Sequence, residues 1–593
     1  MINFFEKEPF GFLKNINLFQ MAVLNPQIAM LSYLKVGEKI AAQPKKIEES
    51  QQDFLNRILE LQKKFVNDVC REICKDDTEK CIDLNYNEKK GKFEDNPFEN
   101  NPSMRFVRQF HETTASWMLD TLASVDGVDE KIMHSARFFM KQYINLMSPD
   151  NFPFLNPKVL QKTLETGGEN LKKGLEMLMA DLNKGTITTN DTSKFKIGRD
   201  IASTKGKVIY QNDLIELIQY TSTTAKVFSK PILFVPPWIN KFYILDLNEK
   251  LSFVKWAVDL GFTVFMISWV NPDKKHRNKG FDNYAFEGLI DSINKIAEIT
   301  KAKSIHALGY CVGGTLISAL LAYLAHPNCK KRPKMRLESA TLLTTLLDFE
   351  RAGDMAIFMT DSYLESINVQ LEEKGYLDGQ VMFNTFSALK ANDMIWRYFV
   401  NSYMLGEKPS AHEILFWNSD PTNITQAMQT FLSRDMYRDN LLKTGTLKLG
   451  GVPLELNRIR NIPIYMISTI KDHIVPWEAA FDGTKLFNTS IRFVLGGSGH
   501  VAGAINPPWR NKYCYWINEK HVDNSQEWLK TATELSGSWW NDWFKWIKPM
   551  LGEMVAPRHV KNFIRDAPGV YVYKSNINDI SYDSDDSNRE ETI

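Results

Sequence analysis

A cysteine lies at the centre of the segment Gly309-Tyr310-Cys311-Val312-Gly313-Gly314. The apolar run 304–308 precedes this segment and is typical of a short buried strand, and the small and aliphatic run 315–325 after it is typical of a buried helix. A strand, a Gly-x-nucleophile-x-Gly turn and a helix in this order predict a very tight turn. The residues two places before and after the nucleophile are then glycines, because the turn leaves no space for a larger side chain than hydrogen. A thiol at that apex predicts chemistry on thioesters.

A thiol nucleophile needs a base, and the base needs a group that orients it. The predicted strand 464–468 is followed by Asp472 and His473, and the predicted strand 491–495 is followed by His500 among glycines. Nucleophile, acid and histidine in this order, each after a later strand, are the arrangement of the α/β-hydrolase fold. We therefore predict Asp472 as the orienting acid and His500 as the base.

His473 competes with His500 for the role of base, because it adjoins Asp472. The glycines around His500 and its place after a strand favour His500, and His473 is expected to line the substrate pocket. Taken alone, a Gly-x-Cys-x-Gly match is more often a tight turn with a buried thiol, and an Asp-His pair is more often a turn or a cap. Three motifs in the right order, each at a strand end, make a much stronger signal than any one of them.

The predicted chemistry also needs two backbone N–H groups that bind the oxyanion of a tetrahedral intermediate. One should be that of Val312, the residue after the nucleophile. The other should come from the loop after the predicted strand 231–235. That loop begins Pro236-Pro237, and proline has no N–H to donate. Trp238 and Ile239 remain, and we favour Ile239.

Short apolar runs separated by helical segments fill the chain from about residue 196 onward. Several runs are continuous rather than alternating, as expected for strands buried on both faces of a largely parallel sheet. The predicted strands, of which the first two form an antiparallel pair, are 207–211, 214–220, 231–235, 263–269, 304–308, 339–345, 464–468 and 491–495. The fold class is therefore α/β, an α/β-hydrolase fold with a cap insertion, preceded by a mostly helical N-terminal domain.

The predicted domain organisation has three parts. Residues 1–195 form a helical N-terminal domain, because stripes such as Phe54, Ile58, Leu61 and Phe65 recur at helical spacing. Residues 196–574 form the catalytic domain. It includes an insertion at about 350–460, which is too long for a loop and is expected to cover the site. Residues 575–593 are rich in Asp and Glu and are expected to be a disordered acidic tail.

Composition excludes several classes of function. The chain has 593 residues and a formal net charge of +1, so no overall field argues for nucleic acid. Six cysteines in so long a chain are no disulfide framework and fit a reducing cytoplasm. The N-terminus lacks the order of a secretory signal, no apolar run is long enough to be a transmembrane segment, and no metal site is expected.

Five segments together resemble poly(3-hydroxyalkanoate) synthases, which polymerise (R)-3-hydroxyacyl-coenzyme A into storage polyester. They are the elbow 309–315, the proline loop 235–247, Leu-Leu-Thr-Thr-Leu-Leu-Asp-Phe at 342–349, Asp-His-Ile-Val-Pro-Trp at 472–477 and Gly-Ser-Gly-His-Val-Ala-Gly-Ala-Ile-Asn-Pro-Pro at 497–508. The resemblance extends from about residue 100, and the length of the chain resembles class I, with class II as the second choice. Trp238 stands where many relatives carry a cysteine.

The resemblance implies that the acyl group of a substrate such as 3-hydroxybutyryl-CoA passes to Cys311 while coenzyme A leaves. The hydroxyl of one unit then attacks a neighbouring acyl-enzyme, with either His500 or Asp472 as its base. It also implies a homodimer in the cytoplasm at the surface of polyester granules, where granule-associated proteins are possible partners. No cofactor is expected besides the coenzyme A of the substrate. Residues expected to line the pocket are His473, Trp238, Trp417 and Tyr310.

Two other functions compete with this interpretation. A thioesterase or polyester depolymerase would use the same three residues and pass the acyl group to water. A non-catalytic granule-surface protein would use the apolar N-terminal segment and the tryptophan cluster 539–546. For that cluster we favour a helix packed on the core, and three catalytic motifs in order argue against a scaffold.

Overall fold

The computed structural model describes residues 26–73, 101–520, 522–560 and 562–574. The acidic tail at 575–593 and two of the six cysteines, Cys74 and Cys81, lie outside the described residues. The chain divides into two compact units, which we describe separately. Unit 1 comprises residues 1–189 together with 384–410, and unit 2 comprises residues 190–383 together with 411–593.

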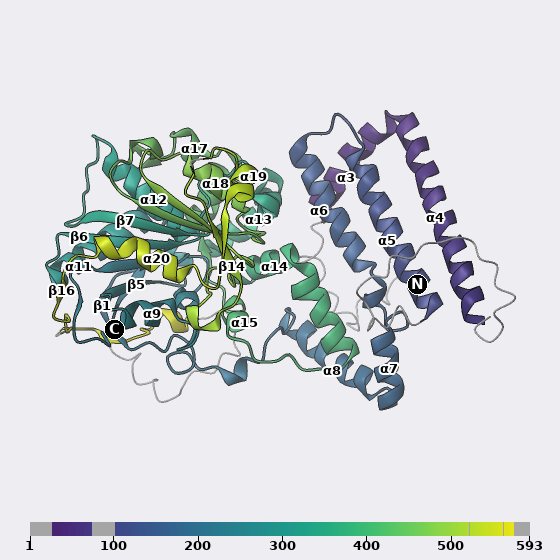
Figure 1. Ribbon diagram of the computed structural model, residues 1–593, viewed down its shortest axis with the longest axis horizontal. Coiled ribbons are helices and arrows are strands. Elements are labelled where there is room, and N and C mark those ends of the chain that lie inside the picture. The colour runs from purple at the N-terminus through teal and green to yellow at the C-terminus, as the bar shows by residue number, and fades with distance from the viewer. Residues whose placement is uncertain (1–25, 74–100, 521, 561, 575–593) are drawn as a thin grey trace. The chain divides into compact units, whose positions relative to one another are not determined.

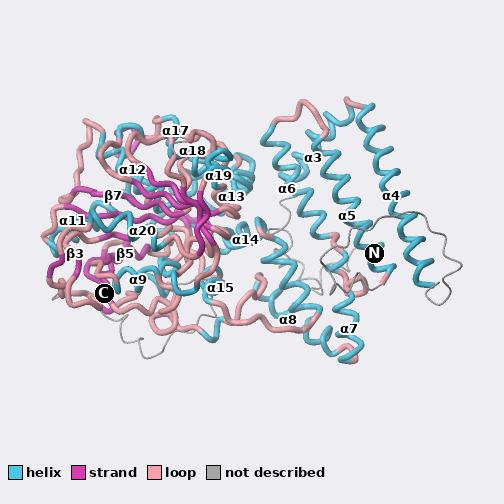
Figure 2. Tube along the Cα trace, viewed as in Figure 1, coloured by secondary structure: helices cyan, strands magenta, loops and turns pink. Residues whose placement is uncertain are grey.

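The described residues of unit 1 form helices joined by loops, with no strand among them, as expected (Figure 2). Asn101 and Asp129 begin two of the helices by accepting backbone N–H bonds. Gly167 ends a third in the left-handed region, at φ 61°, and Gly168 continues there at φ 88°, so the glycine pair separates two helices. The main helices are α3 (Pro26–Ala41), α4 (Pro44–Ile73), α5 (Pro102–Ala123), α6 (Glu130–Leu146), α7 (Pro157–Thr166) and α8 (Glu169–Lys184).

Residues 384–410 pack with these helices, although the sequence analysis placed the whole insertion 350–460 in the catalytic domain. This stretch holds the end of α14 (Gly379–Leu389) and the short helices η7 (Asn392–Trp396) and η8 (Phe399–Met404). Trp396 lies in an apolar cluster with Leu146 and Ile187. The buried carboxylate of Asp181 accepts a hydrogen bond from the Tyr403 hydroxyl at 2.6 Å. Side chains far apart in sequence therefore decide where this part of the insertion belongs.

A twisted eleven-stranded sheet runs through unit 2 (Figure 1). Its order is β15-β14-β13-β12-β7-β6-β4-β5-β2-β1-β17. The strands from β13 to β5 are parallel, and the others pair antiparallel at both edges. The bounds are β1 (Gly206–Gln211), β2 (Ile215–Tyr220), β4 (Ile232–Val235), β5 (Val264–Trp269), β6 (Ser304–Tyr310), β7 (Arg336–Leu343), β12 (Ile464–Thr469), β13 (Ile491–Gly496), β14 (Cys514–Ile517), β15 (Thr533–Ser536) and β17 (Arg565–Asp566).

All eight predicted strands are present, including the opening antiparallel pair β1 and β2. The strands β14, β15 and β17 were not predicted. They are two to four residues long and partly exposed, so they lack the continuous apolar pattern of the central strands. Three pairs of short strands outside the sheet were not predicted either. They are β3 (Val227–Phe228) with β16 (Met554–Val555), β8 (Tyr376–Leu377) with β9 (Ile424–Thr425) and β10 (Lys448–Leu449) with β11 (Val452–Pro453).

Helices pack on this sheet and bury an aromatic core. Trp539, Trp540 and Trp543 at the start of α20 (Trp540–Ile547) join Phe253 of α9 (Phe253–Asp259) in one cluster with residues of the central strands. The tryptophan cluster is therefore a core helix, as favoured from the sequence. The other helices of unit 2 include α11 (Asp291–Thr300), α12 (Val312–Ala325), α13 (Asp361–Lys374), α15 (Glu413–Asn418), α16 (Gln426–Phe431), α17 (Leu441–Thr444), α18 (Trp477–Thr484) and α19 (Ser525–Thr531).

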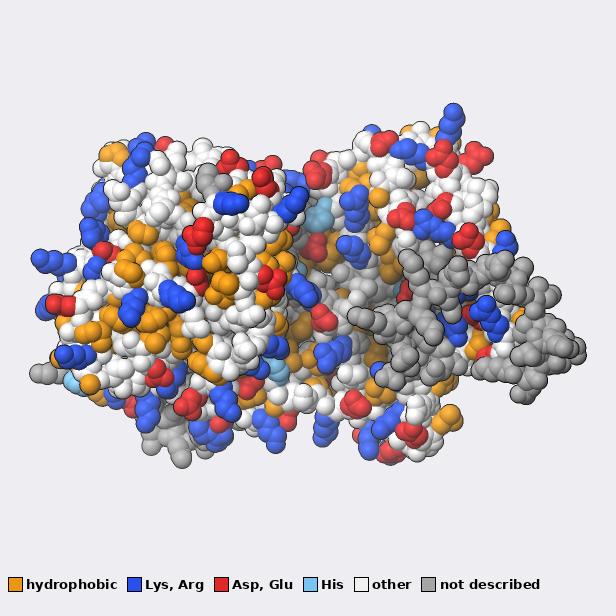
Figure 3. Space-filling model, in the orientation of Figure 1, with side chains coloured by type: hydrophobic (Ala, Val, Ile, Leu, Met, Phe, Trp, Pro, Cys, Tyr) orange, Lys and Arg blue, Asp and Glu red, His pale blue; other side chains and the backbone are white. Residues whose placement is uncertain are grey.

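On the molecular face seen in Figure 3, Lys and Arg side chains are interspersed with Asp and Glu, and hydrophobic side chains lie between them. This mixing agrees with the formal net charge of +1. Among the described residues, no helix combines the length and the apolar character needed to cross a membrane.

Candidate active site

Cys311 lies between β6 and α12, at the apex of a turn whose backbone is strained. Its φ of 54° and ψ of −123° lie in a region that residues other than glycine rarely adopt. Contacts on both sides hold this conformation. The Cys311 N–H donates to the carbonyl of Leu343 on β7 at 2.8 Å, and the Cys311 carbonyl accepts from the N–H of Gly314 at 2.9 Å. The predicted strand, tight turn and helix are therefore all present.

The glycines of the motif leave no space for a side chain. A Cβ at Gly309 would lie 2.5 Å from the backbone of Gly314, and a Cβ at Gly313 would lie 2.2 Å from the carbonyl oxygen of Val235. A Cβ at Gly314 would lie 2.0 Å from the hydroxyl of Thr345. The start of α12 thus touches the end of β4 and the loop after β7, which brings three loops together around the thiol.

Asp472 and His500 follow the neighbouring parallel strands β12 and β13. The Nδ1 of His500 lies 2.7 Å from Oδ2 of Asp472, and both side chains are buried. The other carboxylate oxygen, Oδ1, accepts the backbone N–H groups of Ile474 at 2.9 Å and Val475 at 2.8 Å. Asp472 is therefore fixed by its own loop and orients the His500 ring. The remaining ring nitrogen, Nε2, is left for the thiol.

The charges around His500 favour a protonated ring. Burial alone would lower the pKa of His500, but the carboxylate of Asp472 and the thiol of Cys311 outweigh burial and raise the pKa to about 10. An imidazolium beside a thiol stabilises the thiolate, which is the reactive nucleophile. The arrangement can therefore supply a nucleophilic sulfur.

The loop 236–241, which we call the oxyanion loop, follows β4 and approaches the start of α12. Val312 is the first residue of α12, so its N–H has no acceptor within the helix. Ile239 is partly exposed, whereas Trp238 is 2% exposed. The Trp238 ring packs on that of Tyr284, with centroids 5.5 Å apart. The assignment of Val312 and Ile239 as donors to an oxyanion stays a prediction.

The residues expected to line a pocket lie in different surroundings. The buried Tyr310 ring is 5.5 Å from the His500 ring, and its hydroxyl donates to the His500 carbonyl at 3.3 Å. Trp417 is buried in α15, and its Nε1 donates to the carbonyl of Lys241 at 2.8 Å. His473 is partly buried, and its backbone oxygen lies near Gly353. Their roles in a pocket stay predictions.

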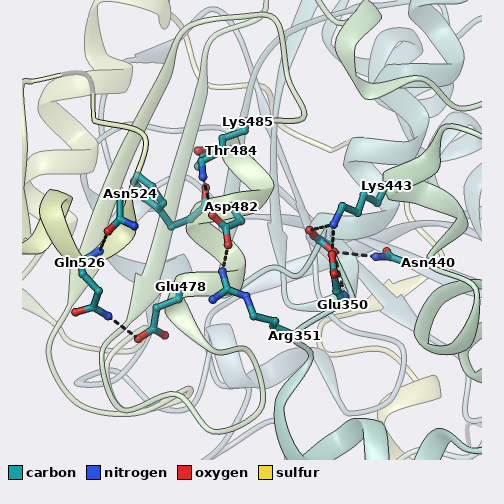
Figure 4. Close-up of polar contacts among 12 residues, drawn as sticks. Glu350, Arg351, Asn440, Lys443, Glu478, Asp482, Thr484, Lys485, Asn524 and Gln526 are labelled. Carbon is teal, nitrogen blue, oxygen red and sulfur yellow. Dashed lines mark hydrogen bonds and ion pairs between the residues drawn. The ribbon is translucent and has the colours of Figure 1, made fainter. Parts of the chain in front are cut away.

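The loop after β7 supports the elbow and was not assigned a role from the sequence. The Thr345 hydroxyl lies 3.3 Å from the Cys311 carbonyl and 3.2 Å from the Leu343 carbonyl. The far end of this loop is tied to two helices, as Figure 4 shows. Arg351 forms an ion pair with Asp482 of α18, and Glu350 forms one with Lys443 of α17. The motif 342–349 could have indicated this loop, but its contacts depend on residues about a hundred positions away.

Tyr437 was also missed. It lies in the short helix η9 (Leu432–Arg438), and its ring is 4.9 Å from that of Phe349, in the loop after β7. Burial raises the pKa of Tyr437, and the charge on Cys311 raises it further, so the phenol is within electrostatic reach of the thiol. No motif surrounds Tyr437 in the sequence, and only the folded chain brings it near the elbow.

The described residues contain no group of three or more His, Cys, Asp or Glu side chains placed to hold a metal ion.

Two family models match the chain. The N-terminal region of poly-beta-hydroxybutyrate polymerase matches residues 89–257, and the alpha/beta hydrolase fold matches residues 230–507. Together with the sheet order, the second match establishes the α/β-hydrolase fold.

Several curated relatives align over most of their length. A poly(3-hydroxyalkanoate) polymerase subunit of Rhizobium etli is 42% identical over 489 residues, which cover 81% of this chain and 76% of that protein. A poly(3-hydroxyalkanoate) polymerase of Methylorubrum extorquens is 41% identical, with 80% of this chain and 78% of that protein covered. A polymerase subunit of Cupriavidus necator is 39% identical, with 81% and 82% covered. This chain therefore belongs to the poly(3-hydroxyalkanoate) polymerase family.

Proposed function

We propose that the chain polymerises (R)-3-hydroxyacyl-CoA, with 3-hydroxybutyryl-CoA as a short-chain substrate, into polyhydroxyalkanoate and releases coenzyme A. One observation carries the proposal. The strained elbow presents the thiol of Cys311 to the ring of His500, which lies 2.7 Å from the carboxylate of Asp472. Membership of the polymerase family supports the choice of substrate.

In the first step, the thiol proton already lies on His500, and the Cys311 thiolate attacks the thioester carbonyl. The carbonyl oxygen becomes an oxyanion that the N–H groups of Val312 and Ile239 bind. When the intermediate collapses, the bond to the coenzyme A sulfur breaks, that sulfur takes the proton from His500, and the acyl group stays on Cys311. One thioester replaces another, so the step is close to isoenergetic, and no cofactor enters it.

In the elongation step, a hydroxyl group loses its proton and attacks a neighbouring acyl thioester, which forms an ester and frees a thiol. His500 is placed to take this proton, with Asp472 stabilising the imidazolium that forms. Asp472 is the alternative base. Both of its carboxylate oxygens already have partners, two backbone N–H groups on Oδ1 and the His500 ring at Oδ2. We therefore favour His500.

The proposal also covers the class, the oligomeric state and the location of the enzyme. We assign the chain to class I, expect it to act as a homodimer, and expect it at the surface of polyester granules in the cytoplasm. Fractionation of cells that express the full chain, or the chain without residues 1–100, tests the granule assignment. Recovery of the full chain away from the granules would contradict it.

The proposed reaction is tested by product analysis. The purified full chain is incubated with (R)-3-hydroxybutyryl-CoA, and released coenzyme A, free acid and insoluble polyester are quantified. We expect coenzyme A and polyester in matching amounts, and loss of both in the Cys311→Ala variant. Coenzyme A with only free acid would show a thioesterase. Full turnover by Cys311→Ala would refute the nucleophile, and no turnover by the wild type would favour a non-catalytic granule protein.

A further inference from the structure

The oxyanion loop contains a lysine whose ammonium group is buried. Lys241 is 3% exposed, and burial lowers its pKa, which the charge of Asp420 partly offsets. Its Nζ donates to the backbone carbonyl of Lys574 at 2.7 Å. A buried ammonium without such partners would strongly destabilise the fold. The hydrogen bond to the Lys574 carbonyl therefore holds the Lys241 side chain in place.

The acceptor of that bond belongs to the last described segment of the chain, residues 565–574, which we call the C-terminal arm. The arm is held at several points. The buried carboxylate of Glu216 accepts the N–H groups of Val570 and Tyr571 at 2.9 Å each. The Nδ2 of Asn271 donates to the same Lys574 carbonyl at 2.9 Å. The carbonyl that receives Lys241 is thus itself fixed by the sheet.

Hydrogen bonds from other segments fix further backbone carbonyls of the oxyanion loop. The Nε1 of Trp269 on β5 donates to the carbonyl of Pro236 at 2.9 Å. From the segment 417–423, Trp417 donates to the Lys241 carbonyl at 2.8 Å and the Thr422 N–H donates to the Ile239 carbonyl at 3.4 Å. Each partner binds the loop from outside, so the loop's shape depends on elements far away in sequence.

Two of these segments, residues 417–423 and the C-terminal arm, both form hydrogen bonds with Lys241. Its backbone carbonyl binds the segment 417–423, and its side chain binds the C-terminal arm. It lies two residues from Ile239, whose N–H is the expected donor to the oxyanion. A shift of about 1 Å at such a donor can cost about a hundredfold in rate. The position of Lys241 therefore bears directly on the acylation step.

We infer that Lys241 is a positioning residue for the oxyanion loop, and that the C-terminal arm holds it through the Lys574 carbonyl. Lys241 does not touch the reacting atoms. It fixes the backbone that presents Ile239 toward the intermediate on Cys311. This inference rests on the proposed function, since it presupposes acylation of Cys311 by a thioester.

Two reactions of the Cys311 thiol distinguish a displaced oxyanion loop from a general loss of thiol reactivity. Acylation by (R)-3-hydroxybutyryl-CoA passes through an oxyanion, whereas alkylation by iodoacetamide displaces iodide and forms none. Both need the thiolate that His500 stabilises. The ratio of the acylation rate to the alkylation rate therefore cancels a change in the amount of thiolate and retains a change in the oxyanion loop. Single-turnover coenzyme A release gives the first rate, and mass spectrometry of the Cys311 peptide gives the second.

In the full-length Lys241→Met variant, we expect this ratio to fall about tenfold to a hundredfold, mainly through kcat rather than KM. Lys241→Arg should recover part of the loss, because a guanidinium can still donate to the Lys574 carbonyl. Lys574→Ala should stay within about twofold of wild type, because it keeps the backbone carbonyl. Lys230→Met is the matched control. Lys230 precedes β4 at the opposite end of that strand and pairs with Glu338 at 2.9 Å, so its loss should leave the ratio unchanged.

An unchanged ratio in Lys241→Met would overturn the inference, and so would an equal fall in both rates. If Lys241→Met does not fold, Lys241→Gln decides by the same ratio, because its side chain is polar but too short to reach the Lys574 carbonyl. Failure of the proposed function looks different. In that case the wild-type chain itself releases no coenzyme A, or Cys311→Ala still releases it.

Discussion

The two sides of the elbow are held in different ways. On the acid–base side, Asp472 is fixed by the N–H groups of Ile474 and Val475, two and three residues further along the chain. On the oxyanion side, the loop 236–241 is fixed by Trp269, Trp417 and the carbonyl of Lys574. Asp472 is therefore held by neighbours in its own loop, whereas the oxyanion loop is held by contacts across the whole unit. The Asp472 loop should therefore tolerate distant changes that disturb the oxyanion loop.

The largest expected effect lies on the acid–base side. His500→Gln removes the base and the positive charge that stabilises the thiolate, so coenzyme A release should fall about a thousandfold. Alkylation of Cys311 by iodoacetamide near neutral pH should fall as well, because less thiolate is present. Quenched single-turnover assays and peptide mass spectrometry measure the two rates. Normal alkylation in this variant would contradict the role assigned to His500.

Asp472→Asn should have the next largest effect, about a hundredfold on coenzyme A release. The amide oxygen can still accept the two backbone N–H groups, so the loop should keep its shape. The negative charge is lost, however, and the pKa of His500 should fall. Less thiolate should then be stabilised, so alkylation of Cys311 at a fixed pH should slow, and an unchanged alkylation rate would show that Asp472 does not act on the ring.

Gly313→Ala probes the contact between the elbow and the oxyanion side. The new Cβ would meet the Val235 carbonyl, which leads directly into the oxyanion loop. Backbone cannot give way as a side chain can, so the start of α12 and the loop should separate. We expect coenzyme A release to fall about tenfold to a hundredfold. Gly280→Ala is the control, since its Cβ would meet only Ala427 at 3.6 Å.

The raised pKa of His500 makes stability depend on pH. In the unfolded chain a histidine has a pKa of about 6.5, whereas His500 titrates at about 10 in the folded chain. Its protonated ring therefore contributes stability that is fully present below about pH 6.5 and is lost as pH rises toward 10. The free energy of unfolding should fall between pH 7 and pH 9, by at most about 1.4 kcal/mol per pH unit from this group. Urea unfolding should show a flatter profile for His500→Gln, and parallel profiles would contradict the assignment.

This difference in construction also explains what the sequence could predict. Asp472 and His500, whose side chains lie 2.7 Å apart, could be placed at strand ends from the sequence because each lies in a short motif after a buried strand. The central strands were predicted because their side chains are apolar on both faces. Lys241 and Tyr437 were missed because their partners lie far away in the sequence. Thr345 was missed because its contact with the Cys311 carbonyl forms only in the folded chain. The same reason applies to residues 384–410, whose place is decided by side chains such as Trp396 and Tyr403 that pack among the helices of unit 1.

The smallest expected effect, a few-fold in acylation, comes from removing a single N–H at either end of the oxyanion loop. Trp269→Phe removes the donor to Pro236, and Trp417→Phe removes the donor to Lys241, while each ring largely keeps its packing. If the loop moves as one body, either change already loosens it, and the double variant should lose less than the product of the two single effects. Multiplicative losses would mean that the two ends move independently. The ratio of acylation to alkylation should fall in each variant, because neither tryptophan supports the thiolate.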